Sequence, residues 1–212
     1  SVEGAPPPEL FIPQHRKFVF GALFKGLSAG FSSLDASQPW LYYWSLNALR
    51  LLSDERIDDP ELKRRAIGSL RDCWNKTTGG FGGGPKQLSH LAPTYAAVRA
   101  LVSLGGKEAY EVIDRPALLR FLLSVKTPEG SFLSHQDGEA DIRGAYCAIS
   151  TAAICNVLTP ELRAGVGDWL ASCQTHEGGF SGSPGNEAHG GYTFCGIASL
   201  SILGETNKVN MK

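Results

Sequence analysis

The feature that most constrains the fold is a tyrosine that recurs near the start of four small-residue, apolar segments. The tyrosines follow one another at intervals of about 50 residues, a period typical of one supersecondary unit repeated along a chain. The four tyrosines are Tyr43, Tyr95, Tyr146 and Tyr192. The residue three positions before each tyrosine changes, and these residues are Trp40, Ala92, Arg143 and His189. Because the side chain at this one position differs in chemistry from repeat to repeat, the sequence predicts a ligand-binding wall rather than a uniform core.

Each repeat contains two helical segments of different character. Inner helices, apolar on all faces and rich in small residues, are expected over 39–52, 92–104, 142–157 and 190–203. Outer helices, with apolar residues at spacings of three and four and charges between them, are expected over 61–75, 116–126 and 161–174. A further helix is expected over 16–28. Because no strand pattern of comparable strength occurs, the sequence predicts an all-α fold of stacked hairpins.

Three related turns separate outer from inner helices, at 79–85, 129–132 and 177–184. Their glycines allow positive φ, and their phenylalanines can fill the space between neighbouring hairpins. A phosphate-cradling loop is the competing interpretation of 79–86, but no Lys-Ser or Lys-Thr pair follows and a proline interrupts the turn. Inner helices surrounded by outer ones indicate a closed α/α barrel or a solenoid, and only the barrel gives a central cavity faced by every inner-helix start.

Composition and charge exclude several classes of partner. The formal net charge of −1 and the pI near 6.5 give no field that would gather nucleic acid or a membrane surface. The five cysteines are odd in number and lack CxxC spacing, which argues against a disulfide framework. Neither a leader peptide nor a run of about 18 apolar residues is present, so we expect a cytoplasmic protein without a membrane span. The proline-rich residues 1–14 predict an extended arm, followed by the repeats over 15–212.

Five stretches carry a specific resemblance: 34–44, 79–85, 90–98, 141–147 and 187–196. In this order they resemble the protein prenyltransferase β-subunit family, and within it the farnesyltransferase branch. The resemblance implies an α/α barrel of about six hairpins, of which this chain would supply about four, paired with an α subunit. It also implies transfer of a farnesyl group from farnesyl diphosphate to the cysteine thiol of a protein that ends in a CaaX sequence.

The resemblance assigns a set of residues to farnesyl diphosphate. His189 would be the catalytic residue, bonding the diphosphate and steadying charge on the leaving group, with Gly190 and Gly191 allowing close approach at a helix N-terminus. Trp40 would close the pocket and favour the 15-carbon donor, whereas a core tryptophan is its alternative role. The other assigned residues are Tyr192, Cys195, Tyr95, Arg143 and Tyr146. Ordinary barrel core remains the alternative for the three tyrosines and for Cys195, and it is equally favoured for Tyr95 and Cys195.

A second set would bind the CaaX peptide. By resemblance Glu139, Arg143 and His90 hold a water that contacts the peptide carboxylate. A guanidinium among apolar helix starts supports an anionic partner, although a surface ion pair is the alternative for Glu139 and Arg143, which are four residues apart. The expected wall around the peptide consists of Trp40, Trp44, Ala36, Ser37, Ala92 and Pro93.

The family uses zinc, and magnesium is a second candidate ion. The zinc ligands are expected beyond Lys212, and no metal ligand is assigned within this sequence. Because the thiolate needs the metal, residues 1–212 alone are predicted to transfer no prenyl group. A type I geranylgeranyltransferase β subunit and a truncated subunit that only binds isoprenoid or the α subunit remain alternatives. A terpene cyclase would need an acidic cluster on an inner helix, and a barrel glycosidase two carboxylates across the cavity; neither pattern is evident.

Overall fold

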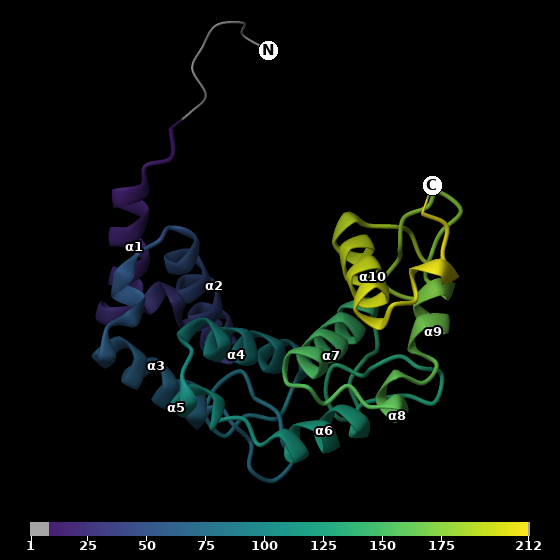
Figure 1. The fold of residues 1–212 in the computed structure, drawn as a ribbon, viewed down its shortest axis with the longest axis horizontal. Helices are drawn as coiled ribbons and strands as arrows, with labels where there is room; N and C mark the ends of the chain where they lie inside the picture. The colour runs from purple at the N-terminus through teal and green to yellow at the C-terminus, as the bar shows by residue number, and fades with distance from the viewer. Residues whose placement is uncertain (1–8, 212) are drawn as a thin grey trace, which may run out of the picture.

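Four inner helices follow one another along the concave side of an arc (Figure 1), in a computed structural model that describes residues 9–211. They are α2 (Gln38–Leu51), α4 (Leu91–Leu104), α7 (Ile142–Ile154) and α10 (Gly190–Leu203). On the convex side lie α3 (Pro60–Asp72), α5 (Lys107–Tyr110), α6 (Arg115–Ser124), α8 (Pro160–Arg163) and α9 (Val166–Ser172). Short 3-10 turns η1 (Ala29–Ser37), η2 (Glu55–Asp58) and η3 (Thr206–Lys208) complete the described elements. Only isolated β-bridges occur in this part of the chain, so the all-α prediction is confirmed.

The first helix begins earlier than the sequence suggested. α1 spans Ile12–Lys25, because Pro13 lies in its first turn, where the missing amide hydrogen costs nothing, and Gly26 ends it with φ +77°. The predicted arm over 1–14 therefore overlaps a helix from residue 12 onward. Its residues 1–8 lie outside the described residues.

The predicted phenylalanine plugs are confirmed by their burial. Phe81, Phe132 and Phe180 are each 0% exposed and belong to the two apolar cores that join neighbouring hairpins. The turn that carries Phe81 also approaches η1 so closely that a Cβ on Gly83 would lie 1.9 Å from the Ala36 carbonyl oxygen. Only glycine therefore fits at position 83.

One backbone hydrogen bond repeats between hairpins and fixes their register. The first amide of an inner helix donates to the carbonyl two residues beyond the next turn phenylalanine, each time at 2.8 Å. The pairs are Gln38 to Gly83, Leu91 to Ser134 and Ile142 to Gly182. The donors of these bonds are the first residues of α2, α4 and α7, and Gly190 is the first residue of α10. The fifth residues of the four inner helices are then Tyr42, Tyr95, Tyr146 and Phe194.

The hydroxyls of Thr94 and Thr193 support this register for the fourth hairpin. They accept hydrogen bonds from the amides of Phe81 and Phe180 at 2.9 and 3.0 Å, so the residues that follow, Tyr95 and Phe194, are equivalent. The predicted alignment of Tyr43 and Tyr192 with the other two tyrosines is therefore wrong. Aromatic residues occur at several neighbouring positions of α2 and α10, and matching tyrosines alone picks the wrong ones.

The four residues that lie three positions before Tyr43, Tyr95, Tyr146 and Tyr192 therefore stand at three different distances from the helix starts instead of one. Ala92 and Arg143 are second residues of their helices, Trp40 is a third residue, and His189 is the N-cap residue of α10. The variable-residue wall predicted from the repeat holds only for the second and third hairpins.

Candidate functional site

A continuous row of aromatic rings connects the four inner helices. The ring centroids of Trp40 and Tyr95 lie 5.6 Å apart, those of Tyr95 and Tyr146 5.4 Å, and those of Tyr146 and Phe194 5.1 Å. We call Trp40, Tyr95, Tyr146 and Phe194 the aromatic row. Rings at these separations present a continuous apolar surface of the kind that lines binding sites for apolar ligands.

The row is most buried in its middle, since Trp40 at one end is partly buried and Phe194 at the other is exposed. Tyr95 and Tyr146 are 8% and 9% exposed, whereas Phe194 is 58% exposed. Burial, together with the hydrogen bond between its hydroxyl and that of Tyr146, whose phenol oxygen lies 3.4 Å away, raises the pKa of Tyr95, so its phenol is neutral at physiological pH. Trp44 extends the row at its first end, 5.4 Å from Trp40.

The predicted pocket cysteine lies among buried residues and is a neutral thiol. Cys195 is 9% exposed, and burial raises the pKa of its thiol to about 11. A thiol in this state is a poor nucleophile, which suits a lining role and excludes a covalent one. Burial likewise raises the pKa of Cys147 on α7 to about 12.

His90, Asp141 and His189 are N-cap residues at the starts of three inner helices. Nδ1 of His90 accepts the amide of Ala92 at 3.0 Å, and Nδ1 of His189 accepts the amide of Gly191 at 3.0 Å. Since Nδ1 is the acceptor, each neutral ring carries its proton on Nε2. His189 is exposed, so its Nε2–H can donate to an anion at the N-terminus of α10.

Arg143 pairs with Asp141, and not with Glu139 as the alternative of a surface ion pair required. Its Nη2 lies 2.5 Å from Oδ2 of Asp141 and its Nε 3.0 Å from the same atom, whereas no direct pairing with Glu139 occurs. Asp141 is favoured because it is the N-cap residue of α7, two residues before Arg143. Although burial alone would raise it, the hydrogen bonds from Arg143 hold the pKa of Asp141 below its usual value.

Arg143 still stands beside the predicted isoprenoid residues. Its guanidinium carbon lies 5.8 Å from the centroid of the Tyr192 ring, which in turn lies 5.3 Å from the ring of His189. The hydrogen bonds that Arg143 donates to Asp141 and, among weaker influences, the charge of Glu139 raise the pKa of Arg143. A fixed cation and an imidazole thus flank Tyr192 at adjacent helix starts.

Part of the predicted peptide wall lines a cavity of about 410 Å³. Ala36, His90 and Pro93 line it, whereas the other residues predicted for the peptide do not: Ser37, Trp40, Trp44, Ala92, Glu139 and Arg143. Residues that the sequence did not single out complete the lining: Gly83, Lys86, Gln87, Leu88 and His135. This cavity is the best-defined concave site at the inner-helix starts.

The His90 ring faces a second imidazole across this cavity. The centroids of His90 and His135 are 5.4 Å apart. Burial first, and then the charge of His135, lowers the pKa of His90, so that His90 is neutral at pH 7. His135 lies three residues beyond the plug Phe132, where the other two turns carry Gly84 and Ser183, so no repeated signal in the sequence marks it.

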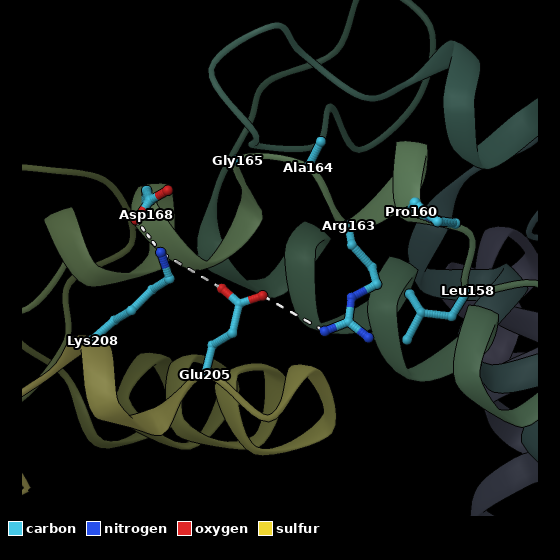
Figure 2. A pocket seen from close by; sticks show the side chains of 8 residues that line it. All are labelled: Leu158, Pro160, Arg163, Ala164, Gly165, Asp168, Glu205 and Lys208. Atoms are coloured by element: carbon cyan, nitrogen blue, oxygen red, sulfur yellow. Dashed lines mark hydrogen bonds and ion pairs between the residues drawn. The ribbon is translucent and has the colours of Figure 1, made fainter.

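A larger cavity of about 540 Å³ lies on the other side of the hairpins, between α8, α9 and η3 (Figure 2). Its charged residues pair with one another: Glu205 lies 3.7 Å from Arg163 and 3.9 Å from Lys208, which also pairs with Asp168. No predicted site residue lines this cavity. The paired charges fasten the segment after α10 to the preceding hairpin, and we assign them a structural role.

Comparison with known proteins decides the family. Residues 10–212 match the model of the prenyltransferase alpha-alpha toroid domain. The chain belongs to this family.

Two curated relatives and one solved structure show which members of the family this chain resembles. Protein farnesyltransferase subunit beta of Arabidopsis thaliana is 50% identical over 192 residues, which cover 89% of this chain and 39% of the relative. The protein of the same name from Pisum sativum is 47% identical over 174 residues, 82% of this chain and 41% of the relative. The structure "Candida albicans protein geranylgeranyltransferase-I complexed with GGPP" superimposes with a TM-score of 0.73 at 21% identity, over 93% of this chain and 60% of that one. The chain thus spans about two fifths of the curated relatives' length, and the solved structure supports the fold.

The toroid domain shows no metal centre in the part that the structure describes. Among residues 9–211, no three histidine, cysteine, aspartate or glutamate side chains are grouped so that they could hold a metal ion. The residues present therefore do not fit the zinc site that the family resemblance implies. In the same range, no helix is both long and apolar enough to cross a bilayer.

Proposed function

We propose that this chain is the isoprenoid- and peptide-binding part of a protein farnesyltransferase β subunit. The observation that carries the proposal is the aromatic row, which ends beside helix starts that carry His189 and Arg143. An apolar surface next to an imidazole donor and a guanidinium fits a ligand with an apolar chain and an anionic head. The names of the relatives, farnesyltransferase β subunits, support the same substrate class.

The farnesyl chain would lie against Trp40, Tyr95 and Tyr146, with Tyr192 and Cys195 completing the wall. Trp40, partly buried, stands at the α2 end of the row, where an indole limits the length of an apolar chain. The 15-carbon donor is therefore favoured over the 20-carbon donor. A type I geranylgeranyltransferase β subunit remains the alternative. Comparing transfer from the 15-carbon and the 20-carbon donor distinguishes the two.

The diphosphate would lie at the N-terminus of α10. Nε2–H of His189 donates to a diphosphate oxygen, and the small Gly190 and Gly191 let the anion approach the backbone. Reaction forms the bond between the peptide sulfur and the first farnesyl carbon and breaks the bond from that carbon to the diphosphate oxygen. His189 and Arg143 stabilise the charge that develops on this leaving oxygen.

The peptide's carboxyl end would occupy the cavity lined by Ala36, His90 and Pro93. Nε2–H of His90 can donate toward a carboxylate or a bridging water. Arg143, with its charge held by Asp141, and Glu139 would complete this end of the site, with Ser37, Trp44 and Ala92 at its margin.

We further propose that an α subunit is the partner, that the complex is cytoplasmic, and that zinc is held by residues outside this sequence, with magnesium as a second ion. Because residues 9–211 contain no metal cluster, a binding-only subunit is the second candidate.

The test uses the full-length β subunit that contains this chain, assembled with its α subunit and supplied with zinc. We expect time-dependent transfer of tritiated farnesyl to a CaaX peptide and none to the peptide with Ser in place of Cys. A complex that binds farnesyl diphosphate without transferring it would support the binding-only candidate. A complex that does not bind it would refute both.

A further inference from the structure

Lys86 occupies a backbone position that favours glycine. Each of the three turns after the plug phenylalanines closes with a hydrogen bond from the amide of its fourth residue to the carbonyl of its first. The pairs are Gln87 to Gly84, Gly138 to His135 and Asn186 to Ser183. The third residue of each turn has positive φ: Lys86 with φ +64°, Asp137 with φ +60° and Gly185 with φ +84°. This is the geometry of a type II turn, whose third residue is normally glycine or asparagine.

Lysine holds this conformation with a strain that glycine avoids. In the third hairpin Gly185 suits the turn, whereas the Cβ of Lys86 makes positive φ unfavourable. Residues that persist in such a conformation cluster at ligand sites, where the position of the side chain matters more than the strain. The surroundings of the Lys86 side chain therefore decide what it does.

The Lys86 side chain lines the cavity of about 410 Å³ that we assign to the peptide's carboxyl end. Of the described residues that line this cavity, Lys86 is the one lysine or arginine, and no aspartate or glutamate accompanies it. Over residues 9–211 its ammonium forms no ion pair with a carboxylate. Because His90 is neutral at pH 7, Lys86 gives the cavity its permanent positive charge.

The two imidazoles of the cavity present different atoms to a ligand. Nδ1 of His90 accepts the Ala92 amide, which leaves Nε2–H as a donor. His135 is the reverse: its Nδ1 lies 2.8 Å from the Gln136 carbonyl oxygen and donates to it, so the neutral ring exposes Nε2 as an acceptor. The His90 ring and the Lys86 ammonium are thus two separate donors in one cavity, the first neutral and the second charged.

We propose that Lys86 selects CaaX peptides whose last residue is acidic. The inference rests on the proposed function, because it assigns the charge preference of the same peptide cavity. With the main-chain carboxylate of the peptide directed toward His90, the last side chain is left to the remainder of the cavity, where Lys86 is the charged group. A glutamate or aspartate there pairs with the ammonium, whose flexible stem adapts to either length. A glutamine of the same shape makes a weaker, uncharged contact.

Three substitutions separate the charge of Lys86 from its effect on the turn. Lys86→Gln removes the charge and keeps a side chain in the strained conformation. Lys86→Gly removes the charge and suits the turn, so this variant should fold at least as stably as the wild type. Lys86→Arg keeps the charge and is the matched control. Each is made in the full-length β subunit, assembled with its α subunit and supplied with zinc.

Two CaaX peptides that differ only in the last residue, Glu or Gln, are compared as farnesyl acceptors. The measured quantity is the ratio of their kcat/KM values, Glu over Gln. We expect this ratio to fall about fivefold in Lys86→Gln and in Lys86→Gly, and to stay within about twofold in Lys86→Arg. Raising the ionic strength should lower the ratio in the wild type and change it much less in Lys86→Gln. Equal losses for both peptides, or a fall in Lys86→Arg as large as in Lys86→Gln, would overturn the inference.

The ratio of dissociation constants for the same two peptides, measured by displacement of a fluorescent CaaX peptide, separates this inference from the proposed function. If the wild-type complex binds both peptides but transfers farnesyl to neither, transfer is wrong and this ratio still decides the role of Lys86. If transfer occurs and neither ratio responds to Lys86→Gln, the proposed function stands and the role of Lys86 is refuted. A wild-type complex that binds neither peptide refutes both.

Discussion

Nδ1 of His189 accepts the backbone N–H of Gly191 at 3.0 Å, and this contact determines which nitrogen of the ring can act on a ligand. The bond fixes the tautomer with the proton on Nε2 and turns that proton away from the helix. His90 makes the same bond to Ala92 at the start of α4, at the same distance. One capping geometry thus presents an imidazole N–H at two helix starts.

Replacing His189 by Asn should separate capping from catalysis. Asn is a good N-cap residue, so the free energy of unfolding should change by less than about 0.5 kcal/mol, but its side chain cannot place a donor where Nε2 stands. We expect the rate of farnesyl transfer in a single turnover to fall about a hundredfold. His90→Asn is the matched variant: it should weaken peptide binding and leave the affinity for farnesyl diphosphate within about twofold. A fall in donor affinity as large in His90→Asn as in His189→Asn would contradict the assignment.

Replacing Trp40 by Thr should lengthen the pocket. The partly buried Trp40 packs 5.6 Å from Tyr95 at the α2 end of the aromatic row, and removing the indole opens space for part of an isoprene unit. We expect the ratio of kcat/KM for the 20-carbon over the 15-carbon donor to rise about tenfold. Trp44, 53% exposed on the same helix, is the control, because Trp44→Thr should leave this ratio unchanged. An unchanged ratio in Trp40→Thr would remove Trp40 from the pocket.

His90 should make stability depend on pH. Burial and His135 depress the pKa of His90 below its ordinary value of 6.5. The unfolded chain then binds the proton more readily than the folded chain, so the stabilisation is present above pH 6.5 and is lost as the pH falls through the folded-state pKa. His135→Gln should reduce this loss and His90→Asn should abolish it. Urea unfolding between pH 5 and pH 8 measures the effect, and identical profiles for wild type and His90→Asn would contradict it.

Asp141 should stabilise α7 in two separable ways. Its carboxylate accepts the Arg143 amide at 2.7 Å as an N-cap and pairs with the Arg143 guanidinium. Asp141→Ala should lower the free energy of unfolding by about 1 kcal/mol, and Asp141→Asn, which keeps the cap, by less than half of that. Equal losses in thermal or urea unfolding would show that the cap contributes little.

Gly83 and Gly68 should respond to alanine with opposite signs. A Cβ at Gly83 would overlap the Ala36 carbonyl, whereas nothing lies within 4 Å of a Cβ at Gly68 inside α3. Gly83→Ala should therefore destabilise the protein by about 3 kcal/mol, and Gly68→Ala should stabilise it by about 0.5–1 kcal/mol. Urea unfolding of the two variants checks both signs.

The hairpin fold could be predicted from the sequence because apolar periodicity and glycine-phenylalanine turns recur in every unit. The position of each residue along its inner helix, counted from the helix start, could not be predicted. Tyr43 and Tyr192 matched the repeat by residue type. Hydrogen bonds invisible in the sequence instead make Tyr42, through the backbone of Gln38, and Phe194, through the Thr193 hydroxyl, the equivalents of Tyr95.

The ionic contacts of the site were equally hard to predict. Glu139 and Arg143 have the spacing of a helical ion pair, yet Glu139 precedes α7 and the N-cap Asp141 takes the guanidinium. Arg99 occurs in an apolar helix without a motif, and only the fold shows that its guanidinium carbon lies 4.6 Å from the centroid of the Tyr95 ring. Local pattern therefore predicts helices well, whereas partners that meet across hairpins need the fold.

The most direct test of the account is a structure of the complete heterodimer with farnesyl diphosphate bound. We predict carbon atoms of the last isoprene unit within about 4.5 Å of the Trp40 indole, and a diphosphate oxygen about 2.7–3.2 Å from Nε2 of His189. A farnesyl chain that lies away from the aromatic row, or a diphosphate held at a site remote from the N-terminus of α10, would contradict it.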